Sequence, residues 1–399
     1  MAYALAYITV FATFALAQTM PQTWAEKYGP QEDMPFSGPL SFAHLPYTKC
    51  LEETSDSHAF DIAILGIPFD SAVTYRPGAR FGPYGIRSGS RRISPYVGYT
   101  TAWASPSMYI AQRILLLQVP VIPFDIPMAM DQIDTAYNTL IRRPVATENN
   151  FSANTTRNAA KDGKPHPRII TLGGDHAVIL PILRSLYSVY GEIAVVHFDS
   201  HLDTWPVQGF YGATNNTVTH GTMFWTAMNE GLIAKGNSIH AGIRCMMTGY
   251  RDIQNDQQVG FSMITTDDIE ELGTDGIIQV IKRRVAGKPV YISIDIDVID
   301  PALAPASKHN SNTLLNYGTT DIVIMCFQLE HPNLDDTNGT AILQTMNFVL
   351  ANRLSTAEST VLVAAGIVHD LLSVLIGRAP SRVSFANPES MAGRRHWSA

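Results

Sequence analysis

Short runs of apolar residues recur along the chain, and several of them stop abruptly at polar residues. Runs of this length, bounded by turn-forming residues, are typical of strands that are buried on both faces of a parallel sheet. We therefore predict strands at Asp61–Gly66, Arg168–Leu172, Glu192–Val196, Ile239–Arg244 and Pro289–Ile294.

The segments between these runs have the wider apolar spacing of amphipathic helices. Helices are expected over Ala177–Tyr190, Thr274–Arg284 and Thr360–Ile376. Alternation of strand and helix predicts an α/β fold with a parallel sheet. No linker-like break interrupts it between Asp61 and Ile294, so residues 18–399 are interpreted as one domain. Residues 147–167 are polar and rich in Asn, Lys and Pro, which predicts a mobile surface insertion.

The run that ends at Val196 leads into a segment with metal-binding side chains at every second position. These side chains are Asp199, His201 and Asp203. Successive side chains of an extended chain point to opposite faces, so these three point the same way. A buried strand that ends in two carboxylates and an imidazole brings candidate metal ligands to its carboxyl end.

Two other strands end in the same manner. Arg168–Leu172 runs into Gly173-Gly174-Asp175-His176, and Pro289–Ile294 runs into Asp295-Ile296-Asp297. In open parallel α/β sheets, ligands bind outside the carboxyl ends of the strands. Three strands are therefore predicted to deliver ligand-type side chains to one edge of the sheet.

Together the strand ends provide six candidate ligands: His176, Asp199, His201, Asp203, Asp295 and Asp297. A single tetrahedral zinc ion needs about four ligands, so six ligands suit two metal ions. Carboxylate and imidazole without thiolate favour Mn²⁺, and four aspartates balance the charge of two divalent ions. Two such ions generate a nucleophile from water near neutral pH.

Each candidate has a simpler interpretation when it is considered alone. An Asp at a strand end is more often a turn former or a helix N-cap than a ligand. This applies to Asp175, for which capping of the following helix, or support of a metal ligand, is the better interpretation. His240 on its strand is interpreted as a buried structural histidine. The metal hypothesis rests on the joint pattern, since three motifs each follow a buried strand.

These motifs resemble the ureohydrolase family, which contains arginase and agmatinase. The resemblance is carried by Gly173-Gly174-Asp175-His176, Phe198-Asp199-Ser200-His201-Leu202-Asp203, Ser293–Pro301, Tyr75–Pro83 and His220-Gly221-Thr222-Met223-Phe224. Within the family the chain most resembles agmatinase-type members of fungi that carry an N-terminal secretory segment. The resemblance implies a three-layer α/β/α fold with a central, mostly parallel sheet of about eight strands.

The resemblance also implies a chemistry. Two Mn²⁺ ions bound by the six ligands would support hydrolysis of a small cationic guanidino substrate to urea and an amine, with agmatine giving putrescine. Asp199 would ligate metal and orient the nucleophile, and His220 matches the family's active-site histidine, which shuttles a proton. The unperturbed pKa of histidine suits that role. Without the family, a surface loop histidine is the better interpretation of His220. Symmetric homo-oligomers are typical of the family.

The chain departs from the family over residues 306–356, which follow Ala304-Pro305. The family's substrate-side loop is replaced there, and no counterpart is found of the strand whose glutamate contacts the guanidinium. Two alternatives therefore stay open beside agmatine hydrolysis. One is a ureohydrolase for another linear guanidino compound such as guanidinobutyrate, and the other is a metal-binding pseudoenzyme. A single-zinc deacetylase of similar architecture would leave Asp203, His176 and Asp297 unexplained.

Net charge and cysteine content exclude some classes of partner and of metal site. The formal net charge is −7 and no basic stripe is present, which argues against a nucleic-acid partner. A negative field weakly favours a cationic substrate. The three cysteines include no Cys-x-x-Cys pair, which excludes a thiolate metal site on spacing.

The first residues of the chain predict its location. Residues 1–17 are largely apolar, carry no charge and end in Ala15-Leu16-Ala17, a pattern of a signal peptide without the usual basic start. The apolar stretch is short for a membrane span, so we expect a secreted protein with no stable membrane association. Sequons at Asn150, Asn154, Asn215 and Asn338 permit glycosylation on that route.

Overall fold

A computed structural model describes residues 40–48, 51, 59–75, 77–93, 114–148, 151–208, 218–300, 323–329, 364–369 and 371–372. All of them belong to one compact unit, which spans residues 39–399. The predicted signal peptide, three of the four sequons and most of residues 306–356 lie outside the described residues. No helix in the described ranges is long and apolar enough to cross a membrane.

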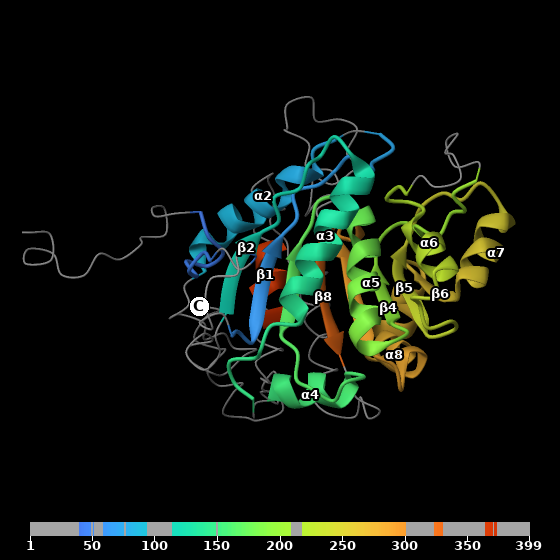
Figure 1. Ribbon diagram of the computed structural model, residues 1–399. Helices are drawn as coiled ribbons and strands as arrows, with labels where there is room; N and C mark the ends of the chain where they lie inside the picture. Colours follow the sequence, from blue (N-terminus) through green and yellow to red (C-terminus); the bar gives the residue numbers. More distant parts are fainter. Residues whose placement is uncertain are drawn as a thin grey trace, which may run out of the picture. The chain divides into compact units, whose positions relative to one another are not determined.

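The centre of this unit is an eight-stranded sheet (Figure 1). Its strands are β1 (Ile62–Gly66), β2 (Ile114–Gln118), β3 (Arg168–Leu172), β4 (Ala194–Phe198), β5 (Ser238–Ile243), β6 (Phe261–Thr265), β7 (Val290–Asp295) and β8 (Val323–Leu329). Their order across the sheet is β2-β1-β3-β8-β7-β4-β5-β6. All pairs are parallel except those that β8 makes with β3 and β7. The predicted α/β fold with a mostly parallel sheet is confirmed.

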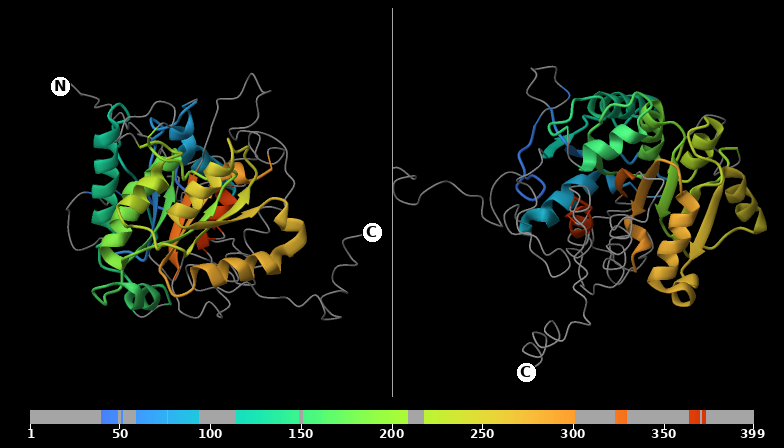
Figure 2. Two further views of the ribbon diagram at one scale, coloured as in Figure 1. Left: turned by 90° about the vertical axis from the view of Figure 1, so that its right-hand side faces the viewer. Right: turned by 90° about the horizontal axis from the view of Figure 1, so that it is seen from below.

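Helices cover both faces of the sheet (Figure 2, right). They are α2 (Gly82–Gly89), α3 (Ile126–Ile141), α4 (Phe151–Ala159), α5 (Ile179–Tyr190), α6 (Met223–Asn229), α7 (Tyr250–Val259) and α8 (Asp268–Val285), with further helical residues at 364–369 and 371–372. Helices α3, α5 and α6 pack on one face, and α2, α8 and residues 364–372 contribute to the core on the other face.

Two hydrophobic cores follow directly from the alternation of side chains along the strands. In β1, Ile62 and Ile64 enter one core and Ala63 and Leu65 enter the other. All residues of β1, β3, β4, β5 and β7 are buried. This explains why their sequences are continuous apolar runs, since neither face of these strands contacts water.

The structure differs from the sequence prediction in two stretches. Residues 147–167, predicted to be a mobile insertion, contain helix α4. No strand was predicted in residues 306–356, but they contain β8. This strand lies in the middle of the sheet. Because β8 is antiparallel, Val323 pairs with Asp295 and Leu329 pairs with Val290. The last residue of β8, Leu329, therefore lies at the edge opposite the carboxyl ends of β3, β4 and β7.

Candidate metal centre

The turn after β3 places His176 at the carboxyl edge of the sheet. Gly174 passes so close to the backbone that an added Cβ would lie 1.7 Å from the Phe69 carbonyl oxygen, so only glycine fits. Asp175 caps the following helical turn by accepting from the Ala177 backbone N–H at 2.9 Å, and it also accepts from the Ala72 N–H at 2.9 Å. The predicted capping role of Asp175 is confirmed.

The segment after β4 brings Asp199, His201 and Asp203 to the same edge. The His201 backbone N–H donates to Asp199 Oδ1 at 2.6 Å, which fixes the carboxylate against its own turn. Asp203 has a φ of 55°, a left-handed conformation that few residues other than glycine adopt. Strained backbone of this kind occurs where the surroundings determine the position of a functional side chain.

The end of β7 supplies the last two carboxylates. Asp295 accepts from the Asp297 backbone N–H at 2.9 Å, and Asp297 Oδ1 accepts from the hydroxyl of Ser200 at 2.8 Å. The Arg244 guanidinium donates to the backbone carbonyl groups of Asp297 and Val298, the second at 2.9 Å. These contacts tie the loop after β7 to the segment after β4.

The side chains at this edge form two groups of potential metal ligands that share one carboxylate. The inner group consists of His176, His197, Asp199 and Asp203, and the outer group consists of Asp199, His201 and Asp297. Within each group the ligand atoms lie within 4.8 Å of one another. Asp199 belongs to both groups, so its carboxylate could contribute to holding either of two ions.

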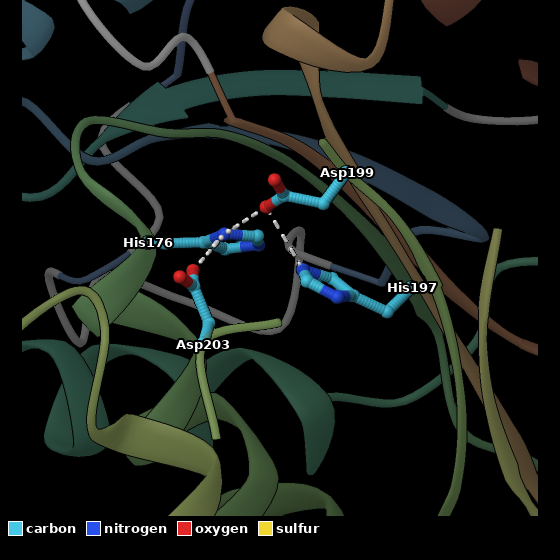
Figure 3. A group of neighbouring side chains, drawn as sticks. All are labelled: His176, His197, Asp199 and Asp203. Atoms are coloured by element: carbon cyan, nitrogen blue, oxygen red, sulfur yellow. Dashed lines mark hydrogen bonds and ion pairs between the residues drawn. The ribbon is translucent and has the colours of Figure 1, made fainter. Parts of the chain in front are cut away.

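The inner group is buried and centres on His176 Nδ1 (Figure 3). This nitrogen lies 3.1 Å from Asp199 Oδ2, 3.0 Å from Asp203 Oδ2 and 3.8 Å from Asp295 Oδ2. The other ring nitrogen lies 2.7 Å from Ser293 Oγ. A histidine that holds a metal with one nitrogen and a hydrogen-bond partner with the other has this arrangement.

The outer group lies at the wall of a cavity. His201 Nδ1 is 3.0 Å from Asp297 Oδ2 and 3.3 Å from Asp199 Oδ1. The His201 side chain is 17% exposed, whereas that of Asp199 is 1% exposed. The outer group therefore contains the ligand candidate that is most exposed to solvent.

The carboxylates impose strong electrostatic effects on the imidazoles. Burial opposes a charge on His176, but the hydrogen bonds and charges of Asp199 and Asp203 outweigh it and raise the pKa of His176 well above its ordinary value. Burial likewise opposes a charge on His201, and the same kind of partners raises its pKa to about 12. The pKa of His197 is instead lowered to about 4, because burial dominates there. The cluster thus attracts positive charge.

Two observations show that these residues fit a pair of divalent cations. Asp199, Asp203, Asp295 and Asp297 are all buried, and uncompensated buried carboxylates at one site are costly. Asp297 Oδ2 and His197 Nε2 are buried, and each lies 3.0 Å from a group of the opposite charge type, His201 and Asp199 respectively, without a well-aligned hydrogen bond. Oxygen and imidazole ligands without sulfur suit Mn²⁺ better than a soft metal.

The cavity beside the outer group has a volume of about 1390 Å³ and includes His201, Asp203 and His220 in its wall. His220 is buried, and its Nε2 accepts from the Thr74 backbone N–H at 3.3 Å and lies 2.9 Å from Thr74 Oγ1. His220 is therefore a fixed residue of the cavity and not a surface loop histidine. All six predicted ligands and His220 come together around one site.

Sequence analysis missed several residues that support this site. His197 lies two positions before Asp199 and therefore has the same strand phase, and that phase was the available signal. Ser293, Arg244 and Thr74 had no signal in the sequence, because their contacts join segments that are far apart in the chain.

Comparison with known proteins agrees with this geometry. A family model described as the arginase family matches residues 60–311. The match ends within residues 306–356, which were predicted to diverge from the family. The protein named "Putative agmatinase 1" of Schizosaccharomyces pombe is 39% identical over 350 residues, which cover 87% of this chain and 84% of that protein.

Two further similarities extend across distant organisms. The agmatinase of Chromobacterium violaceum is 30% identical over 329 residues, covering 79% of this chain and 88% of the relative. Among solved structures, the proclavaminate amidino hydrolase of Streptomyces clavuligerus superposes with a TM-score of 0.61 and 25% identity, covering 86% of this chain and 98% of the other.

Proposed function

The chain belongs to the arginase family, and on that premise we propose that it hydrolyses agmatine to putrescine and urea at a centre of two manganese ions. It is a hydrolase of C–N bonds in guanidino compounds. The observation that carries the proposal is the pair of ligand groups that share Asp199 beside a cavity containing His220.

The ions would be held by the six residues at the strand ends. His176, Asp199 and Asp203 would hold the inner ion, and His201, Asp199 and Asp297 would hold the outer ion, with Asp295 beside the inner group. When bound, two such ions supply Lewis acidity and lower the pKa of water enough to provide a nucleophile near neutral pH. The preference for manganese is supported by the ligand types alone.

Asp199 and His220 are the residues proposed to handle the nucleophile and the proton. Asp199 lies between the two groups, so its carboxylate can orient a nucleophile that forms there. The Thr74 N–H donates to His220 Nε2, so the proton of a neutral ring resides on Nδ1. His220 in the cavity wall can transfer a proton to the leaving amine and exchange it with solvent.

The cavity wall supports binding of a linear substrate. Trp205 and Trp225 line it and offer aromatic surface for a chain of methylene groups and for a cation. The guanidinium carbon must reach the ligand groups, because the chemistry occurs there. The family's glutamate that contacts the guanidinium has no counterpart among the described residues. Glu330, one of the nearest glutamates in the sequence, lies outside the described residues.

One observation favours a second substrate. Arg251 at the start of α7 lines the cavity and is exposed, and it has no hydrogen bond or ion pair with another residue in the described ranges. A free guanidinium in the wall would bind a carboxylate and repel the ammonium of agmatine. Guanidinobutyrate, which carries a carboxylate at that end, is therefore the second candidate.

The test is urea release by purified protein reconstituted with Mn²⁺, with agmatine, guanidinobutyrate and arginine assayed in parallel. Release from agmatine that is lost in Asp199→Ala supports the proposal. Preferred hydrolysis of guanidinobutyrate, with a KM that rises in Arg251→Gln but not in the remote control Arg157→Gln, would transfer the assignment to the second candidate. Two bound ions without urea release from any substrate would identify a metal-binding pseudoenzyme.

Secretion and assembly are separate proposals. The apolar residues 1–17 support export, and Asn154 is an exposed sequon on α4 that a glycosylating pathway could modify. The family's usual symmetry supports a homo-oligomer. Detection of the glycosylated protein in culture medium, and its mass by light scattering, test these two proposals.

A further inference from the structure

A buried carboxylate closes a loop of the chain after β1, which we call the β1 loop (residues 70–75 and 77–80). Asp70 has no exposed surface, and its Oδ2 accepts from the Gly78 backbone N–H at 2.6 Å and from the Arg80 backbone N–H at 3.2 Å. Its Oδ1 accepts from Arg80 Nε at 2.5 Å and pairs with Nη2 of the same guanidinium. A buried carboxylate is costly unless donors surround it, and here both oxygens have donors. The Asp70–Arg80 pair therefore joins the two ends of the loop.

The β1 loop is also held near its start by two hydrogen bonds of its backbone. The Ala72 N–H donates to Asp175 Oδ2 at 2.9 Å, and the Ala72 carbonyl group accepts from the His220 backbone N–H at 3.1 Å. The loop is therefore bonded on one side to the turn after β3 and on the other side to the segment that carries His220.

The next part of the β1 loop contacts the imidazole ring of His220. The Thr74 backbone N–H donates to His220 Nε2 at 3.3 Å, and Thr74 Oγ1 lies 2.9 Å from the same nitrogen. Two contacts at one ring nitrogen restrict rotation of the ring. Thr74 and His220 line the cavity, whereas Asp70 and Arg80 are not among the described residues that line it. The pair therefore acts on the cavity through the loop, without contact with a substrate there.

We propose that the Asp70–Arg80 pair positions His220 for proton transfer, because it holds Thr74 against the imidazole ring. A proton-transfer residue must lie within hydrogen-bond reach of the reacting group, and a displacement of about 1 Å can cost about 100-fold in rate. Asp70 and Arg80 are positioning residues, and Thr74 is the residue through which they act. This inference deepens the proposed function and rests on it, since it assigns a support to His220 and involves none of the metal ligands.

Two variants test the pair and its contact with the ring separately. Asp70→Asn keeps the size of the side chain but removes its charge and turns one acceptor into a donor that faces other donors. Thr74→Val removes the hydroxyl contact and keeps the backbone N–H. The matched control is Asp61→Asn, because Asp61 is also buried, directly precedes β1 and accepts from the Thr147 N–H and hydroxyl at the other end of that strand. Circular dichroism and thermal unfolding establish that each variant is folded.

The first readout is steady-state hydrolysis of the preferred guanidino substrate, together with the Mn²⁺ content of each protein. We expect kcat to fall about 100-fold in Asp70→Asn and about 10-fold in Thr74→Val, because His220 is no longer held within reach of the leaving group. The KM and the Mn²⁺ content of Asp70→Asn should change by less than about twofold, because the pair contacts neither substrate nor metal. Asp61→Asn should have the kcat of the unaltered protein.

The second readout does not depend on turnover. It is the rate at which diethyl pyrocarbonate modifies His220, followed by mass spectrometry of the peptide that contains it. His220 is 6% exposed and Thr74 contacts its Nε2, so the reaction should be slow in the unaltered protein and in Asp61→Asn. The reaction should be severalfold faster in Asp70→Asn and Thr74→Val, because local opening of the β1 loop exposes the ring.

An unchanged kcat, or unchanged reactivity of His220, in folded Asp70→Asn would overturn the proposal. Loss of Mn²⁺ from Asp70→Asn would overturn it as well, because the pair would then support the metal centre. If Asp70→Asn fails to fold, a Thr74→Val protein with full kcat and unaltered reactivity of His220 would overturn it instead. Failure of the proposed function is distinguishable. If no substrate releases urea but His220 becomes reactive in Asp70→Asn, the hydrolase assignment fails while the positioning of His220 by the pair stands.

Discussion

The inner and outer ligand groups share Asp199 but are held by different kinds of structure. The inner group is held by central strands, because its member His197 lies on β4 and its member His176 contacts Ser293 on β7, and all of its members are buried. The outer group depends on turns: the Ser200 N–H donates to Asp297, the His201 N–H donates to Asp199, and Arg244 donates to the Val298 carbonyl group. We infer that the inner site is the rigid one and that the outer site is the one that exchanges its ion.

Asp199 belongs to both ligand groups, so Asp199→Asn should have the largest effect on metal binding and on urea release. The amide carries no charge and cannot bridge two cations, and we expect the loss of both ions and of urea release. Elemental analysis of metal per chain measures this directly. Asp162→Asn, on an exposed side chain, is the control, and two ions per chain in Asp199→Asn would show that the carboxylate is not shared.

His201→Gln should separate the two sites. This imidazole belongs only to the outer group, so the stoichiometry should fall from two ions to one, with an outer affinity more than about 100-fold weaker. His176→Gln is the matched variant for the inner group. Calorimetric titration with Mn²⁺ measures the affinity of each site in both variants. If His201→Gln weakened both sites equally, the two groups would not bind their ions independently.

Both sites should bind metal more weakly at low pH. In the metal-free protein the pKa of His176 is well above its ordinary value and that of His201 is about 12, so both rings are protonated at neutral pH. A bound ion displaces each proton, so each affinity should rise about tenfold per pH unit near neutrality. Calorimetry in buffers of different ionisation enthalpy counts the protons, and uptake in place of release would refute this account.

The smallest effect is expected when the supports of the outer site are loosened. Arg244→Met removes the donors to the loop after β7, and we expect the outer affinity to fall about 10-fold with the inner affinity unchanged. Arg184→Met, in an exposed ion pair with Glu230, is the control. An equal fall at both sites would indicate that Arg244 supports the whole edge.

The sequence predicted the ligand set because local rules determine it. Strand periodicity places Asp199, His201 and Asp203 on one face, and the carboxyl ends of parallel strands converge on one edge. The continuous apolar runs likewise located β1, β3, β4, β5 and β7.

What the sequence did not reveal depends on contacts between distant segments. His240 was predicted to be a buried structural histidine, and the structure does bury it, but its link between His197 and Asp256 joins β4, β5 and α7. The antiparallel direction of β8 is also not visible in any local sequence pattern, because the connection that precedes a strand sets its direction. The helix α4 arose in a polar stretch whose composition alone indicated a loop.

The position of β8 has a consequence for how the protein is made. In the strand order β2-β1-β3-β8-β7-β4-β5-β6, β8 is the last strand in sequence among the described residues, and it lies between β3 of one half-sheet and β7 of the other. His176 follows β3 on one side of it, and the other five predicted ligands follow β4 and β7 on the other side. During synthesis on the ribosome, the two halves can form early, but the metal centre closes only when β8 has left the exit tunnel and inserted. A nascent chain that stalls before residue 323 should therefore carry every predicted ligand without being able to retain both ions.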